Sequence, residues 1–222
     1  MKKLDQDDDV SLTLALSLPP PLPPPPPPPP TDPALPPPPA SARSRQPRSR
    51  PNKKNKTDVV EPPYPWATST RAKVHTLAHL LAHNVTTVTG EMRCKSCEAT
   101  YDISYDLREK FVELGTYIVD HMGSMHHRAP ERWKRPALAR CERCGLAGSA
   151  RPVVAARKKR INWLFLLLGE FLGFLTLEQL RYFCRHAGVH RTGAKDRLLY
   201  LTYLGICRQL DPHGPFGSTN NN

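Results

Sequence analysis

The chain has 222 residues and a formal net charge of +12, and most of its 26 prolines precede residue 52. The length that can fold is nearer to about 160 residues, enough for one ordinary domain with its own core, and the charge favours polyanionic partners. Because Lys2 and Lys3 are followed at once by Asp5 and further aspartates, the start does not fit a secretory signal peptide, and we expect a reducing compartment rather than a disulfide-linked secreted protein.

Four leucines alternate with other residues near the start of the chain: Leu12, Leu14, Leu16 and Leu18. In a tail without a core, such alternation suits binding in extended form, with every second side chain in a pocket of a partner. The stretch resembles the L-x-L-x-L form of the plant amphiphilic repression motif. That resemblance implies recruitment of a TOPLESS-type co-repressor.

Residues 1–62 are expected to form a disordered, proline-rich and basic tail. An unbroken proline run fills 23–30, and such a run forms a stiff polyproline II helix that serves as a spacer or docks on aromatic-lined grooves. Residues 41–56 have the composition of a nuclear import signal, a nucleic-acid tether or a solvated linker. Their basic residues are Arg43, Arg45, Arg48, Arg50, Lys53, Lys54 and Lys56.

Two helices and an extended segment are expected next. The apolar spacing predicts a helix over 68–85, with His75, His79 and His83 forming an exposed ridge rather than a metal site. Residues 86–94 read as extended, with a glycine turn before Cys94. A second helix is predicted over 106–122, because Asp106 and Glu109 fit a capping box ahead of an apolar face.

Two C-x2-C pairs supply four thiols: Cys94, Cys97, Cys141 and Cys144. Two such knuckles can complete the tetrahedral four-thiolate shell of a structural zinc ion, with "TYDISYD" as the strand that leaves the first knuckle. The intervening residues 98–140 hold a whole helix, so the site is ribbon-like with a helical insertion. A redox centre is the alternative, but it would require a thioredoxin-like βαβ unit that the pattern lacks.

The apolar stretch 161–177 follows a basic cluster and raises the question of a membrane span. It is short, and Glu170 lies near its centre. A charge at that depth is expensive in a bilayer. We expect a buried core segment and no membrane association.

The residues 175–207 are predicted to form two helices. Thr176 and Gln179 make a capping box, Gly188 ends the first helix, and the second begins near Ala194. The segment resembles the SAP motif of chromatin and RNA-processing proteins, which implies DNA-backbone contacts at the loop and the second helix. The second helix is apolar nearly all round, so a purely structural helix pair remains the alternative.

The whole layout also resembles an uncharacterised plant protein family over roughly 62–212, through "PPYPWAT", the cysteine pairs, "INWLFLLLG" and "RTGAKDRLLYLTYLG". That resemblance implies a zinc-bearing domain without an established activity.

The sequence as a whole predicts an α+β fold: a zinc-ribbon-like four-cysteine site with a helical insertion and C-terminal helices, in a domain over 63–212, followed by a disordered tail over 213–222. We expect a nuclear, non-enzymatic zinc protein that regulates transcription by recruiting a co-repressor and contacting DNA or RNA, without a small-molecule substrate. The alternative is an RNA- or chromatin-associated or protein–protein adaptor without repression. The residues expected to contact nucleic acid are Arg157, Lys158, Lys159, Arg160, Arg191, Lys195 and Arg197.

Overall fold

The computed structural model describes residues 23–26, 59–190 and 192–216. Residues 23–26 are exposed and form neither helix nor strand. The helices and strands among the described residues belong to the compact unit that begins at Lys53. The alternating leucines, the basic linker 41–56, Arg191 and the tail from 217 onward lie outside the described residues.

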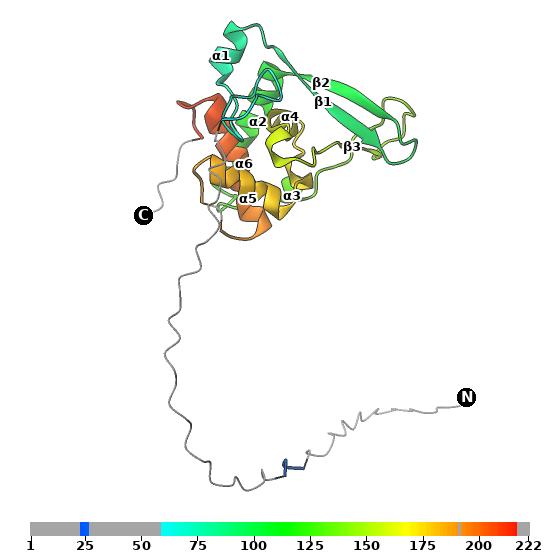
Figure 1. Ribbon diagram of the computed structural model, residues 1–222, viewed down its shortest axis with the longest axis vertical. Coiled ribbons are helices and arrows are strands. Elements are labelled where there is room, and N and C mark those ends of the chain that lie inside the picture. Colours follow the sequence, from blue (N-terminus) through cyan, green and yellow to red (C-terminus); the bar gives the residue numbers. More distant parts are fainter. Residues whose placement is uncertain (1–22, 27–58, 191, 217–222) are drawn as a thin grey trace, which may run out of the picture. The chain divides into compact units, whose positions relative to one another are not determined.

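Helices and strands are mixed along the chain, which confirms the expectation of a mixed α and β fold (Figure 1). The order is α1 (Leu77–Ala82), β1 (Thr87–Cys94), β2 (Thr100–Asp106), α2 (Leu107–His121), α3 (Glu131–Lys134), β3 (Ala150–Pro152), η1 (Lys158–Arg160), α4 (Trp163–Leu168), η2 (Leu172–Phe174), α5 (Leu177–His186) and α6 (Lys195–Leu210).

The three strands form one antiparallel sheet in the order β2-β1-β3. β1 and β2 make a long hairpin whose register runs from Thr87 opposite Asp106 to Arg93 opposite Thr100. β3 pairs with the end of β1 and places Ala150 opposite Cys94. In Figure 1 the hairpin extends away from the helices, so the loops at its far end are held apart from the helical core.

Two expectations for the first half of the domain need correction. The helix predicted over 68–85 is confined to α1, because residues before it pair instead in short bridges, Val59 with Thr70 and Ala67 with Val74. Gly90 is not a turn: it lies within β1, where an added Cβ would come 2.3 Å from the ring of Phe165. The glycine therefore allows α4 to pack directly on the sheet.

The second predicted helix is confirmed as α2. The Asp106 side chain accepts a hydrogen bond from the Glu109 amide at 2.7 Å and so caps the helix start. Its buried apolar face is formed by Leu107, Phe111, Leu114 and Ile118, with Gly115 between them, whereas Met122, which was also expected on this face, is half-buried.

The apolar stretch 161–177 lies in the core, as expected, and every residue of α4 is buried. Glu170, the charge within this stretch, accepts a hydrogen bond from Trp133 Nε1 at 2.9 Å and forms an ion pair with Arg132. Within the described part of the chain, every helix is too short or too polar to cross a membrane.

The C-terminal helices pack on each other and complete the core. Thr176 and Gln179 form the predicted capping box of α5, and Gly188, with φ of +68°, follows the end of that helix. α6 starts after Ala194 and buries residues on nearly all its sides, from Leu198 to Leu210. Packing extends beyond residue 212, because the Phe216 ring is buried 5.9 Å from the ring of Phe111.

Candidate metal centre

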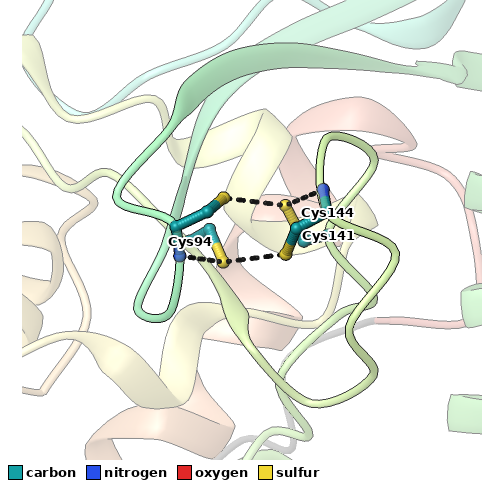
Figure 2. A group of neighbouring side chains, drawn as sticks. Cys94, Cys141 and Cys144 are labelled. Atoms are coloured by element: carbon teal, nitrogen blue, oxygen red, sulfur yellow. Dashed lines mark hydrogen bonds between the residues drawn. The ribbon is translucent and has the colours of Figure 1, made fainter.

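Two loops bring the four paired cysteines together (Figure 2). The first pair lies at the end of β1 and in its turn to β2. The second pair lies in a loop closed by the bridge between Ala139 and Ala150, and Ala150 is also the partner of Cys94 in the sheet. The sheet register therefore holds the loops face to face, although the pairs are more than 40 residues apart in sequence.

The two loops have the same backbone design. In the first, the Cys94 amide donates to the Ala99 carbonyl at 3.0 Å, and in the second the Cys141 amide donates to the Leu146 carbonyl at 3.0 Å. The fourth residue after each leading cysteine has a left-handed conformation. It is Glu98 with φ of +57° in the first loop and Gly145 with φ of +72° in the second.

Backbone amides point at the leading sulfur of each loop. Cys94 Sγ accepts from the amides of Ser96 and Cys97 at 3.3 and 3.4 Å. Cys141 Sγ accepts from the two amides that follow it by two and three residues, at 3.3 and 3.5 Å. Amide donors of this kind stabilise a thiolate, which is the form that binds metal.

The sulfur positions fit a tetrahedral ion. All four Sγ atoms lie within 4.8 Å of one another, and the distances Cys94–Cys144 and Cys97–Cys141 are both 3.8 Å. A tetrahedron with metal–sulfur bonds of about 2.3 Å has edges of about 3.8 Å. A disulfide needs about 2.05 Å, and all six cysteines of the chain are free. The four side chains can thus hold one metal ion.

The pKa values of Cys94, Cys97 and Cys141 are shifted in different directions. The Ser149 hydroxyl, together with the loop amides, lowers the pKa of Cys94 to about 6. The amide of Cys144 is the largest cause that lowers the pKa of Cys141. Although the Ala99 amide favours the Cys97 thiolate, burial and the neighbouring thiols raise the pKa of Cys97 to about 12. A bound cation would remove this repulsion and allow all four thiolates to coexist.

The cluster is buried on one side and open on the other. Cys94 and Cys141 are buried, whereas Cys97 and Cys144 are exposed. An ion can therefore arrive from solvent, yet four protein sulfurs complete its shell. A complete shell is typical of structural sites, since catalytic ones leave a position for water or substrate.

No second group of three or more metal-binding side chains gathers among the described residues. The rings of the expected histidine ridge lie against one another: His75 and His79 are stacked with centroids 4.2 Å apart, and His79 and His83 are tilted with centroids 4.1 Å apart. These histidines are not among the described side chains that gather into a metal-binding group.

The residues expected to contact nucleic acid are dispersed over several elements. Arg157, Lys159 and Arg160 are exposed at η1. Lys158 forms an ion pair with Glu178 at 3.0 Å. Lys195 donates to the Gly173 carbonyl at 2.8 Å, and Arg197 is half-buried.

Two residues beside the cysteine loops, Ser149 and Tyr101, could not be identified from the sequence. Ser149 is buried, lies 3.4 Å from Cys94 Sγ and donates to the Leu146 carbonyl at 2.7 Å. Tyr101 accepts from the Glu142 amide at 3.2 Å and so ties the hairpin to the second loop. An isolated serine or tyrosine has no diagnostic spacing, so only the fold identifies them.

The comparisons with known proteins give a family but no activity. Neither the curated proteins nor the solved structures contain a match to this chain. A family model described as a domain of unknown function, DUF7086, matches residues 77–210, more than half of the chain, and this span includes all four paired cysteines. The chain therefore belongs to the DUF7086 family.

Proposed function

We propose that this protein is a nuclear, non-enzymatic zinc protein that regulates transcription. Its four-cysteine cluster holds a structural zinc ion in a ribbon-like site, the basic surface contacts nucleic acid, and the alternating leucines recruit a co-repressor. The observation that carries the proposal is the closed four-sulfur cluster on two matched loops.

Zinc is the metal that this site suits best. Four thiolates in a tetrahedron select zinc or iron. Zinc has no redox chemistry, so it suits a site whose role is to hold two loops together. The ion would join the hairpin tip to the loop after α3, in addition to the pairing of β1 with β3, the hydrogen bond from the Lys95 amide to the Ser149 carbonyl and the Tyr101–Glu142 hydrogen bond.

Metal binding and folding of this region are therefore expected to be coupled. Cys94→Ser should lower the zinc content and unfold the region around 85–165. Cys184→Ser is the matched control, because Cys184 is buried at the α5–α6 contact and belongs to no cluster. A Cys94→Ser protein that retains its zinc and its melting temperature would contradict the structural role.

The partner side of the proposal rests on the leucines. Leu14→Ala/Leu16→Ala should abolish co-repressor binding and repression in a reporter assay, because an extended segment presents every second side chain to one partner face. Thr13→Ala/Ser17→Ala is the control, because these residues alternate with the leucines in the sequence. If the leucine variant represses as strongly as the parent and the control variant, the protein is instead an RNA- or chromatin-associated adaptor that does not repress through this motif.

A further inference from the structure

A basic groove lies beside α5, away from the paired cysteines in sequence. Its volume is about 1020 Å³, and three segments line it: the turn before α1, η1 and α5. The lining residues are Thr70, Arg71, Lys158, Lys159, Tyr182, Arg185 and His186. We refer to this set as the α5 groove.

The α5 groove gathers positive charge, and its acidic neighbour Glu178 lies in an adjoining hollow. Four of its seven lining residues are lysine or arginine, and none is acidic. A smaller hollow beside it adds Arg181 and Glu178. Glu178 pairs with Lys158, but the Glu178 side chain is 78% exposed and that of Lys158 is 41% exposed. A solvent-exposed pair of this kind contributes little stability. A phosphate can therefore replace the carboxylate at low cost.

Clustered cations repel one another, and an anionic ligand relieves that repulsion. Arg181 and Arg185 lie one turn apart on α5, where side chains point from the same face of the helix. The basic side chains therefore lie close together along the groove and its adjoining hollow. Such a distribution suits a ligand that carries several phosphates rather than one isolated anion.

Tyr182 adds a donor at the same place. Its hydroxyl is buried and has no hydrogen-bond partner among the described residues, and such groups are usually satisfied by water or a ligand. Burial raises the pKa of Tyr182, so the hydroxyl keeps its proton at neutral pH. The ring lies against His186, with centroids 4.5 Å apart.

We propose that the α5 groove binds the phosphodiester backbone of a nucleic acid. This inference rests on the nucleic-acid contact in the proposed function. It assigns that contact to the groove residues Arg71, Lys158, Lys159 and Arg185, with Arg181 from the adjoining hollow. The groove is open and polar, whereas pockets for small molecules are mostly apolar and enclosed. The contacts are to phosphate, so they fix position without reading base sequence.

The test uses the full chain with the seven basic residues of 41–56 changed to glutamine, so that the linker cannot mask the groove. Binding of a labelled 20-nucleotide strand, as single-stranded DNA, single-stranded RNA and duplex DNA, is measured by fluorescence anisotropy between 50 and 200 mM salt. Lys159→Gln/Arg185→Gln is compared with Arg108→Gln/Arg135→Gln, two exposed positions outside the groove with the same charge change.

Loss of two phosphate contacts should lower the slope of log affinity against log salt by about 1.8 on duplex DNA and by about 1.4 on single strands. Between 50 and 200 mM salt, the fold by which duplex affinity falls would be about 12 times smaller in the groove variant than in the linker variant that serves as its background. The control pair should keep the slope of that linker variant. Melting temperatures measured in parallel show that both variants fold.

The outcomes separate the two proposals. If the groove variant and the control bind alike, the α5 groove is not the site, while nucleic-acid binding itself stands. If neither the parent nor the linker variant binds any of the three probes at 50 mM salt, both the groove and the nucleic-acid contact are wrong. The probe that loses most affinity in the groove variant identifies the preferred form of nucleic acid.

Discussion

Replacing Gly145 with alanine should destabilise the second cysteine loop through the backbone alone. Gly145 has φ of +72°, and an added Cβ would come no closer than 3.7 Å, to the Arg140 side chain, so no steric clash contributes. The left-handed conformation costs an L-residue about 1–2 kcal/mol. Alanine recovers about 0.4–1 kcal/mol by restricting the unfolded chain. The net loss is about 1 kcal/mol, or about 2–4 °C in melting temperature for a domain of this size.

The first loop provides the reverse experiment. Glu98 occupies the equivalent position with φ of +57°, so Glu98→Gly should raise the stability by up to about 1 kcal/mol. Gly123→Ala is the control, because Gly123 has no contact within 4 Å of an added Cβ and no positive φ. Thermal unfolding of the zinc-loaded, reduced proteins measures all three. A Gly145→Ala protein as stable as the parent would refute the matched-loop account.

Three further substitutions probe the packing around the sites. Gly90→Ala should cost about 1–3 kcal/mol in urea unfolding, because the new Cβ would overlap the Phe165 ring and force α4 off the sheet; unchanged stability would mean that the ring moves freely. Glu170→Ala should lower the free energy of unfolding by about 1–3 kcal/mol, because the buried Trp133 Nε1 would lose its acceptor. Glu170→Gln keeps an acceptor and should lower it less. Equal losses of stability in the two variants would contradict that cause. Tyr182→Phe should leave the melting temperature unchanged or slightly higher, since its hydroxyl has no hydrogen-bond partner among the described residues to lose. A clear decrease of the melting temperature in differential scanning calorimetry would contradict this reason.

The four-cysteine cluster was predictable from sequence because its signal is local and repeated. Each C-x2-C pair defines its own loop, and "TYDISYD" forms β2 as expected. The helix caps at Asp106 and Thr176 were equally predictable from sequence. Each cap is a hydrogen bond between a side-chain oxygen and the backbone amide two or three residues later. Local rules of this kind do not depend on the rest of the fold.

Other features depend on contacts between distant segments and were missed or wrong. From the sequence alone, Gly90 suggests a turn, because its close contact with the Phe165 ring depends on the fold. The helix expected from residue 68 gives way to bridges, because Ala67 and Val74 pair with each other and the peptide groups are satisfied there. The α5 groove unites Arg71 with Arg185 across more than 100 residues. Lys158 and Lys159, which line the groove, were singled out from the sequence, but Arg71 and Arg185 were not, because their proximity depends on the fold.

The most direct test of the central claim is native mass spectrometry of the protein purified under reducing conditions. The account predicts one zinc ion per chain, held by Cys94, Cys97, Cys141 and Cys144, with the zinc lost in Cys144→Ser. A chelator should release it and leave the exposed Cys97 and Cys144 open to alkylation. A folded, metal-free chain, or zinc that persists in Cys144→Ser at one ion per chain, would contradict the account.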